Sequence, residues 1–503
     1  MTATSLLALA PLRLEARAVS RGAPGLRVER TGPGPRRAAA AAARLAAGHR
    51  AGAPVAVTGI GGALVEGLVP GELIVADRVV DANGGLVAVI PSASLLASAL
   101  RRGGLRARVG TVASADRVVR GRQARAALAA HGAMAVDMES AAILRQGWDG
   151  PVAVVRAVAD TPERELISAG TVAGGIAALR ALRAAAPHLA TWAAAVRPRR
   201  VVLASPRSFC AGVDRAIETV ERAIARYGAP VYVRRQIVHN SHVVAGLEAQ
   251  GAVFVEELHD VPDGATVVLS AHGVAPAVRD EAARRGLAVI DATCPLVAKV
   301  HSEIRRFHQR GYQIVLVGHG GHDETEGSMG EAPGIQLVST AEDAAAVDAA
   351  DPDRVAYVTQ TTLAPDETSS VIEALRDRYP ALAGPHASDI CYATQNRQDA
   401  VRAAAVDSDV VLVVGSPNSS NAARLVEVAR RSGTPAHLVD DPAAVDLEWL
   451  SDAGTVAVTA GASTPEAVVS QVVEALRGLG PLEVAERTVH TENVSFSLPP
   501  EVR

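Results

Sequence analysis

The chain is predicted to be an α/β protein with two consecutive domains, and three observations in the sequence support this. Short apolar runs alternate with helical segments along its 503 residues, which is the pattern of strands covered by helices. The segment TWAAAVRPRRVVLAS combines a helix end, a short basic linker with proline and a new apolar strand. All three cysteines follow this segment. We therefore expect domains at 1–198 and 199–503, each long enough for a core of its own.

The cysteines Cys210, Cys294 and Cys391 each occupy a loop directly before a predicted helix. An odd, sparse set without a CxxC pair argues against a disulfide framework. A helix N-terminus favours a thiolate or an anionic cluster. A [4Fe–4S] cluster normally takes four cysteines, so a cluster with three would have one iron free to bind a substrate. Isolated cysteines are more often small buried apolar side chains, so the interpretation depends on their neighbours.

Other loops in the second half also follow apolar strands, and they carry hydrogen-bond donors. In open parallel sheets the carboxyl ends of the strands form the binding face, so these loops should meet there. Imidazoles, hydroxyls, amides and helix N-termini donate to phosphate oxygens, which predicts a diphosphate site with few Arg or Lys. One such residue alone would be a helix cap or a turn. The loop residues are His272, His319, His322, Glu324, Glu326, Thr359, Gln360, Thr361, Thr362, Ser416, Asn418, Ser419, Ser420, Asn421, Ser463 and Thr464.

Nine segments of the second half carry a family resemblance. They are SFCAGVDRAIE, VHNSHVV, SAHGV, DATCPLVAKVH, GHGGHDETEGSMG, TQTTL, DICYATQNRQ, VVGSPNSSNAARL and TAGASTPE. In content and order they resemble 4-hydroxy-3-methylbut-2-enyl diphosphate reductase, the last enzyme of the methylerythritol phosphate route to isoprenoids. The resemblance covers roughly residues 199 to 503. It implies a trefoil of three small α/β units around a central iron–sulfur cluster.

The resemblance also implies a reaction and a role for individual residues. The reaction is a reductive dehydroxylation that takes two electrons and two protons, removes an allylic hydroxyl as water, and yields isopentenyl and dimethylallyl diphosphate. The three cysteines would hold a [4Fe–4S] cluster. Glu324 would give a proton to the leaving oxygen, with Thr361 relaying or orienting, because a carboxyl in a partly dry pocket can hold a proton near neutral pH. The residues implied around the diphosphate are His239, His272, His322, Ser419, Ser420, Asn421 and Ser463.

The first domain is also predicted to be α/β, with a strand in APVAVTGIGGAL that ends in a Gly-rich turn. Its segments TGPGP, PGELIVAD, GTVASADRVV and VDMESAA resemble the purine nucleoside phosphorylase and nucleosidase family. The resemblance implies that Met138 and Glu139 hold a ribose and that Asp160 acts on the purine. Some phosphorylase-like proteins act on an adenosylated hopanoid, so we also consider that substrate. The alternative is an inert structural domain, because aromatic residues that could stack a base are nearly absent.

Composition excludes several other functions. A net charge of −4 gives no case for binding nucleic acid or an anionic membrane. No stretch reaches the roughly 18 apolar residues of a membrane span, and no signal peptide is expected. Free thiols and an oxygen-sensitive cluster favour the cytoplasm. No GxGxxG motif precedes a ribose-binding acid, so electrons should come from a ferredoxin- or flavodoxin-type partner.

Two rival functions for the second half stay open at this point. One is an iron–sulfur redox sensor joined to an inert N-terminal scaffold. The other is a zinc hydrolase with His322 and Glu324 as ligands, although the chain has no HExxH motif. The sequence leaves undecided the product ratio, the natural electron donor, the oligomeric state and any coupling between the domains.

Overall fold

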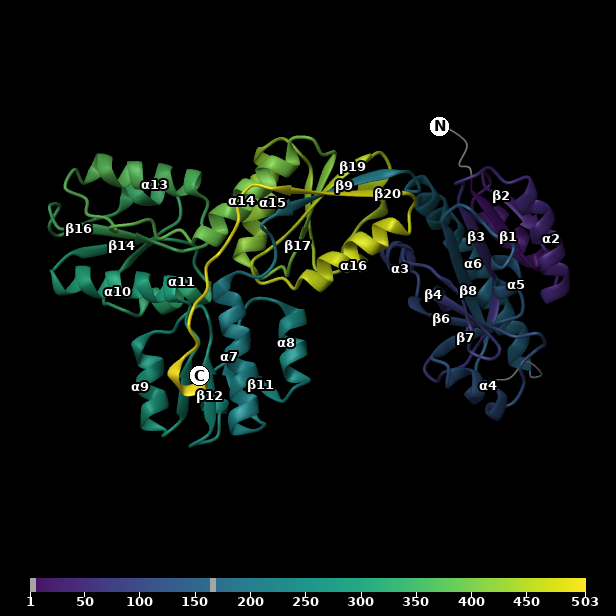
Figure 1. The fold of residues 1–503 in the computed structure, drawn as a ribbon, viewed down its shortest axis with the longest axis horizontal. Coiled ribbons are helices and arrows are strands. Elements are labelled where there is room, and N and C mark those ends of the chain that lie inside the picture. The colour runs from purple at the N-terminus through teal and green to yellow at the C-terminus, as the bar shows by residue number, and fades with distance from the viewer. Residues whose placement is uncertain (1–5, 163–168) are drawn as a thin grey trace. The chain divides into compact units, whose positions relative to one another are not determined.

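The structure is a computed structural model that describes residues 6–162 and 169–503, which form two compact units (Figure 1). The first unit comprises Met1–Val201, Asp441–Val456 and Ser470–Val484. The second comprises Val202–Asp440, Ala457–Val469 and Ala485–Arg503. Within the described residues, no helix combines the length and the apolar character that crossing a membrane requires.

The first unit is built on one sheet of eight strands, in the order β2-β1-β3-β7-β6-β4-β5, with β8 paired to β3 and β4. Because β8 joins β3 to β4, the strands β3, β7, β6, β4 and β8 close into a ring. The strands are β1 (Leu7–Ala10), β2 (Arg27–Arg30), β3 (Val55–Ala63), β4 (Leu73–Asp81), β5 (Leu86–Val89), β6 (Ala107–Ser114), β7 (Ala133–Asp137) and β8 (Val152–Asp160). Closure leaves the ring without free edges, so its backbone groups are paired.

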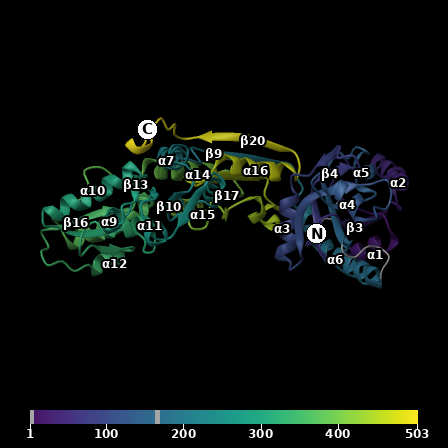
Figure 2. The same ribbon diagram turned by 90° about the horizontal axis from the view of Figure 1, so that it is seen from below.

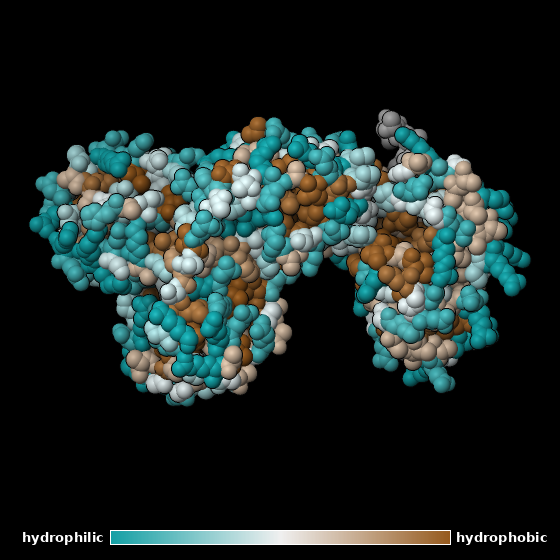
Figure 3. Space-filling model, in the orientation of Figure 1, coloured by the Kyte–Doolittle hydropathy of each residue, from teal (hydrophilic) through white to brown (hydrophobic). Residues whose placement is uncertain are grey.

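Helices surround this sheet and bury their alanine- and leucine-rich faces against it. They are α1 (Arg13–Gly22), α2 (Pro35–Ala47), α3 (Ala93–Arg102), α4 (Arg122–Ala129), α5 (Ser140–Leu144) and α6 (Ala169–Ala194). Figure 3 shows hydrophilic residues over much of the visible surface of this unit and an apolar area around α3 and β4. Leu95, Leu96 and Leu100 of α3 are buried, which anchors that helix in the core.

The Gly-rich turn expected at Gly59–Gly62 is instead part of strand β3, which continues to Ala63. The physical reason is close packing of charged side chains against the strand. A Cβ atom at Gly59 would collide with the guanidinium of Arg156, and one at Gly62 would lie 3.1 Å from Asp160 Oδ1. The glycines therefore make room for buried side chains rather than for a change of chain direction.

Three further sheets carry the rest of the chain, in agreement with the predicted trefoil of α/β units. Their orders are β11-β10-β12-β13, β15-β14-β16 and β18-β17-β19-β9-β20. The first two are parallel throughout, and β17 pairs with β18 in parallel. Most residues of the third sheet lie in the second unit. Strands such as β17 are buried along their whole length, as expected for sheets covered on both faces.

The strands of these sheets run from residue 199 to residue 488. They are β9 (Arg199–Ser205), β10 (Val231–Arg234), β11 (Ala252–Val255), β12 (Thr266–Leu269), β13 (Ala288–Asp291), β14 (Gln313–Val317), β15 (Gln336–Val338), β16 (Val355–Thr359), β17 (Val410–Val414), β18 (Ala436–Val439), β19 (Thr455–Ala460) and β20 (Leu482–Thr488). Almost every strand is short and Val-rich, and the loop after it leads into a helix. This strand–loop–helix order was predicted from the sequence.

The helices of this part begin close to the carboxyl ends of the strands. They are α7 (Ala211–Tyr227), α8 (Ser241–Glu248), α9 (Pro276–Arg284), α10 (Pro295–Gln309), α11 (Asp323–Met329), α12 (Ala341–Ala346), α13 (Pro365–Arg378), α14 (Tyr392–Ala405), α15 (Ser420–Arg431) and α16 (Glu466–Arg477). The C-terminal segment runs alongside α7, as Figures 1 and 2 show. Tyr227 donates to the Glu501 carbonyl at 2.9 Å, and Val502 is buried in the core of this part.

Candidate active site

The predicted site residues of the second half meet in one cavity of about 120 Å³. They come from loops at the carboxyl ends of strands in all three sheets, so the sheet topology brings segments far apart in sequence together. The residues that line the cavity include Cys210, Cys294, Cys391, His239, His272, His322, Glu324, Thr361, Ser419, Ser420, Asn421 and Ser463.

The three cysteines occupy the same position in three helices, since each is the N-cap residue of α7, α10 or α14. A Cβ atom at Gly212 would lie 2.7 Å from Cys294 Sγ and 3.8 Å from Cys210 Sγ, so this glycine lets two sulfur atoms approach one helix end. Among the described residues, the one group of three possible ligands within 4.8 Å of each other does not include the cysteines. A single tetrahedral ion would need sulfur atoms about 3.8 Å apart. The three sulfur atoms are therefore too far apart to share one tetrahedral ion in this structure.

Burial raises the pKa of each thiol. The pKa of Cys294 rises to about 11 and that of Cys391 to about 12, and that of Cys210 is also raised. Backbone N–H groups of the first helical turn oppose this shift at each sulfur, although none forms a regular capping hydrogen bond. The thiols are therefore protonated without a bound metal, and metal binding would release their protons.

Glu324 is the most deeply buried acid of the cavity, with 3% of its surface exposed. Thr361 donates to both carboxyl oxygens, from its backbone N–H at 2.7 Å and from its hydroxyl at 3.0 Å. Burial outweighs these bonds and raises the pKa of Glu324 to about 7. At neutral pH the group is therefore divided between its acid and its carboxylate form.

Three imidazoles form a cluster beside this acid. The rings of His239 and His272 stack with centroids 4.1 Å apart, and His322 meets them edge-on at 5.1 and 5.7 Å. Burial lowers the pKa of all three, to about 4 for His322. His322 Nδ1 accepts the Glu324 backbone N–H at 3.2 Å. Its proton must then lie on Nε2, which makes that atom a donor.

Hydroxyl and amide groups complete the lining. Ser463 donates to the His239 carbonyl at 3.0 Å, and Ser419 Oγ lies 3.5 Å from Ser463 Oγ. Asn421 accepts the Ala462 N–H at 3.1 Å, which fixes the orientation of its amide. Among the described lining residues, none is Lys or Arg. An anion here would be held by neutral donors and by the helix N-termini of α11 and α15.

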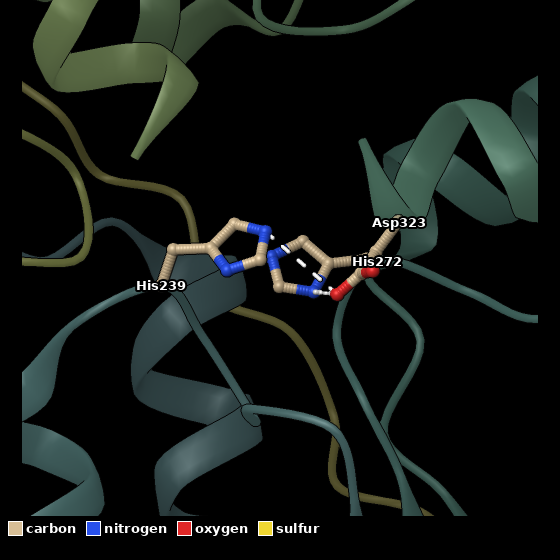
Figure 4. A group of neighbouring side chains, drawn as sticks. All are labelled: His239, His272 and Asp323. Carbon is tan, nitrogen blue, oxygen red and sulfur yellow. Dashed lines mark ion pairs between the residues drawn. The ribbon is translucent and has the colours of Figure 1, made fainter. Parts of the chain in front are cut away.

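Asp323 and Arg235 belong to the site but were not selected from the sequence. Asp323 Oδ2 lies 3.8 Å from His239 Nε2 and 3.8 Å from His272 Nδ1, as drawn in Figure 4. Arg235 has a positive φ of 54° and donates to Asp323 and to Glu326, the latter at 2.7 Å. In the sequence, Asp323 stands between the predicted site residues His322 and Glu324, and this position was the signal that could have identified it.

Residues of the matched segments that received no role have structural partners. His301 pairs with buried Glu331 at 2.8 Å, and His319 faces Glu367 at 3.5 Å. Glu326 pairs with Arg235. These contacts support the loops without facing the cavity.

A second cavity, of about 360 Å³, lies in the first unit. Met138, Glu139 and Asp160 all line it. Glu139 is buried and accepts the Gly34 backbone N–H at 2.7 Å. Asp160 forms a buried ion pair with Arg125.

Sequence reasoning missed Glu15, Asp137 and Arg125, which line this cavity, and Arg156, which is fully buried beside Asp137. Glu15 is buried, accepts the Ile60 N–H at 2.8 Å and lines the cavity, and burial raises the pKa of both Glu15 and Glu139. Arg156 is fully buried and pairs with Asp137 at 2.5 Å. In the sequence, Glu15 and Arg125 each stand in a charged helical segment, which is typical of a solvent-exposed face.

The three sheets define an α/β protein, and one cavity at the carboxyl ends of their strands brings three cysteines together with hydroxyl, amide and imidazole groups. Residues 201–477 match the family model described as LytB protein. The chain belongs to this family. Residues 25–186 match the model described as Phosphorylase superfamily, so the first unit has a phosphorylase-like fold.

Curated relatives and a solved structure agree with this assignment. The chain is 58% identical over 308 residues to 4-hydroxy-3-methylbut-2-enyl diphosphate reductase 2 of Mycobacterium bovis, which covers 60% of this chain and 94% of that protein. It is 56% identical to the reductase of Aromatoleum aromaticum, over 61% of this chain and 98% of that protein. The structure of the corresponding reductase from Plasmodium falciparum matches with a TM-score of 0.58 and 36% identity, over 61% of this chain and 97% of that one.

Proposed function

We propose that residues 199–503 reduce (E)-4-hydroxy-3-methylbut-2-enyl diphosphate to isopentenyl and dimethylallyl diphosphate. Two electrons and two protons are consumed, the allylic C–O bond breaks, one C–H bond forms and the oxygen leaves as water. The observation that carries this proposal is the single cavity in which three cysteines, a buried acid and a set of neutral anion donors meet. The relatives from Mycobacterium bovis and Aromatoleum aromaticum are named as reductases of this diphosphate, which supports the choice of substrate.

We propose that Cys210, Cys294 and Cys391 hold a [4Fe–4S] cluster. The fit rests on the equivalent N-cap positions of the three thiols and on a spacing too wide for one ion. When bound, such a cluster supplies electrons and one iron without a protein ligand that can act as a Lewis acid. The three helix N-termini favour the negative charge that the thiolates bring.

The diphosphate would lie among the donors opposite the cysteines. His239, His272 and His322 offer ring N–H groups, while Ser419, Ser420, Asn421 and Ser463 offer hydroxyl and amide donors. Neutral donors keep the cavity free of fixed cations, so the charge of the diphosphate can itself draw protons onto nearby imidazoles.

Glu324 would supply the proton that leaves with the hydroxyl oxygen. Its pKa of about 7 keeps a large acid fraction at neutral pH. After transfer, the carboxylate still accepts two hydrogen bonds from Thr361, so the product state of the acid is stabilised. Thr361 thus fixes the carboxyl in the orientation that faces the substrate.

Electrons would arrive from a ferredoxin- or flavodoxin-type protein. This follows from the lack of a nucleotide-binding fingerprint in the sequence. The three cysteines are free thiols, which favours a reducing compartment such as the cytoplasm.

Anaerobic turnover with reduced methyl viologen tests the proposal. The reconstituted full-length protein should convert the substrate to both isoprenoid diphosphates, and protein without iron and sulfide should not. A full iron and sulfide complement without product would contradict the reductase and favour the redox sensor. Zinc in place of iron, with hydrolysis of the substrate, would favour the zinc hydrolase.

We also propose that residues 1–198 cleave a nucleoside, with Met138 and Glu139 on the ribose and Asp160 near the purine. The supporting observation is the cavity of about 360 Å³ with buried acids. Leu12 and Val118 line it and remain 41% and 46% exposed, which suits a substrate with an apolar substituent such as an adenosylated hopanoid.

Release of adenine from a nucleoside panel, with and without phosphate, tests whether this domain cleaves nucleosides. Glu139→Gln should abolish release and exposed Glu29→Gln should not, whereas no release by the wild type would indicate an inert scaffold.

A further inference from the structure

The chain has 50 Lys and Arg residues, and Lys299 is the one lysine among them. It lies in α10, the helix whose N-cap residue is Cys294. Its ammonium group bonds to the segment that leads into Cys391. We propose that Lys299 is a positioning residue that fixes the Cys391 segment against the helix of Cys294. Its effect on a cluster rests on the proposed function, whereas its effect on the segment does not.

The ammonium group of Lys299 uses all three of its donors. Nζ donates to the Ala387 carbonyl at 2.8 Å, to the Ser388 carbonyl at 3.0 Å and to Asp389 Oδ1 at 3.1 Å. Three acceptors therefore converge on one nitrogen atom. An ammonium group carries three N–H bonds on that one atom, whereas a guanidinium group spreads its N–H bonds over a plane. The geometry thus requires lysine, in a chain whose other strongly basic side chains are all arginine.

The segment held by Lys299 depends on bonds from other elements. Residues 384–391 form neither helix nor strand. The Asp389 side chain is fully buried, while that of Lys299 is 31% exposed. Its second oxygen, Asp389 Oδ2, accepts the Thr359 N–H at the end of β16 at 3.1 Å. A buried carboxylate is costly without its cation, so Lys299 is needed to fix this segment between α10 and β16.

The same contacts reach the buried acid of the cavity. The Cys391 N–H donates to the Thr361 carbonyl at 3.0 Å. Thr361 in turn donates to Glu324 from its N–H and its hydroxyl. A shift of the segment would therefore displace both a thiol and the partner of the acid. Lys299 does not line the cavity as the structure describes it, so it acts through Cys391 and Thr361 rather than on the substrate.

Alkylation of the cysteines in the full-length protein without metal, followed by peptide mass spectrometry, tests the proposal. Loss of hydrogen bonds to a charged group shifts a local opening equilibrium about tenfold or more, so Cys391 should react at least about tenfold faster in Lys299→Met. Cys210 should keep its wild-type rate. Lys299→Arg should not restore slow reaction of Cys391. Arg284→Met, which removes an exposed cation from α9, is the matched control and should behave as wild type.

Iron release to a chelator extends the test to the reconstituted protein. Loss of a partner behind a metal ligand weakens metal sites about 10–100-fold, so Lys299→Met should lose iron at least about tenfold faster than wild type. The electron paramagnetic resonance spectrum of the reduced protein should change as well, because one thiolate is displaced. Arg284→Met should show the wild-type release rate and spectrum.

Three alkylation results would overturn the proposal. One is an equal rate for Cys391 in wild type and Lys299→Met, and another is full restoration of the wild-type rate by Lys299→Arg. Faster reaction of all three cysteines in Lys299→Met would assign Lys299 to the stability of the whole unit and overturn its local role. Wild-type protein that takes up no iron would contradict the proposed cluster, while the alkylation result would still decide the role of Lys299 in the segment.

Discussion

The two cavities of the chain bury their carboxyl groups differently. In the second unit, Glu324 is buried, Thr361 is its one hydrogen-bond donor among the residues that the structure describes, and its pKa rises to about 7. In the first unit, Asp160 and Asp137 are buried against Arg125 and Arg156. A buried acid without a cation can hold and release a proton, whereas a buried ion pair gives a fixed charge that orients its surroundings. The comparison explains why Glu324 is suited to proton transfer and why Asp137 and Asp160 are suited to holding polar groups. Glu15 and Glu139 of the first cavity resemble Glu324, because burial raises their pKa values as well.

The largest expected effect comes from the cysteines, which only the second unit contains. Cys391→Ser should reduce turnover to background, because two thiols are too few to retain the proposed cluster. Iron and sulfide analysis with visible spectroscopy would measure the loss, and Cys210→Ser and Cys294→Ser should behave alike. Full iron and sulfide content in all three variants would show that these thiols are not the ligands.

The next effect concerns the unpaired acid itself. Glu324→Gln should lower kcat about 10²-fold or more, the usual range for a lost general acid. The cluster content and the KM should change little, because the amide keeps the shape of the side chain. Glu342→Gln, on exposed helix α12, is the control and should behave as wild type. A large rise in KM with unchanged kcat would indicate a binding role instead.

In the first unit, removing an arginine that pairs with a buried acid should lower the free energy of unfolding. Arg125→Met would leave Asp160 as a buried charge without its guanidinium, at a cost of about 3–5 kcal/mol. The double variant with Asp160→Asn should recover much of this loss. All three tryptophans, Trp148, Trp192 and Trp449, lie in the first unit, so tryptophan fluorescence during urea unfolding reports on this unit alone.

An exposed pair provides the control for that experiment. Arg27→Met removes the surface pair with Glu29, whose side chains are 59% and 40% exposed, and it should change stability little. Equal losses in Arg27→Met and Arg125→Met would contradict the distinction between buried and exposed pairs.

The smallest effect is a pH-dependent change in the stability of the second unit. The folded pKa of Glu324, about 7, lies above its ordinary value of 4.5. The contribution of Glu324 to the free energy of unfolding is therefore fully present below pH 4.5. It falls by on the order of 3 kcal/mol as pH rises through 7, because the carboxylate form is destabilised by burial. Glu324→Gln should then protect α11 from hydrogen exchange at pH 8 relative to wild type, with little difference at pH 4. Greater protection of the wild type at pH 8 would reverse the sign and contradict the raised pKa.

Much of the second unit could be predicted from the sequence because its signals are local. Each apolar run became a strand, and Cys210, Cys294 and Cys391 became N-cap residues as their positions before helices indicated. The loops meet because parallel strands place their carboxyl ends on one face. The sequence also indicated that Glu324 could hold a proton near neutral pH, which its burial supports.

The residues that sequence reasoning missed depend on long-range packing. Arg235 reaches Asp323 from a different sheet, and Arg125 reaches Asp160 from helix α4 to strand β8. Nothing in the local pattern of a charged helix shows that one of its arginines is fully covered. The glycines of β3 were misread for the same reason, since the side chains that require them come from distant segments.

The dependence of kcat on pH tests the central claim most directly. It should be measured anaerobically on reconstituted wild type and Glu324→Gln at equal iron and sulfide content. If Glu324 donates the proton, the wild-type rate should fall about tenfold per pH unit above pH 7, and the variant should be slow with no such limb. The same alkaline limb in both proteins would show that another group supplies the proton, and wild-type protein without turnover at any pH would contradict the reductase itself.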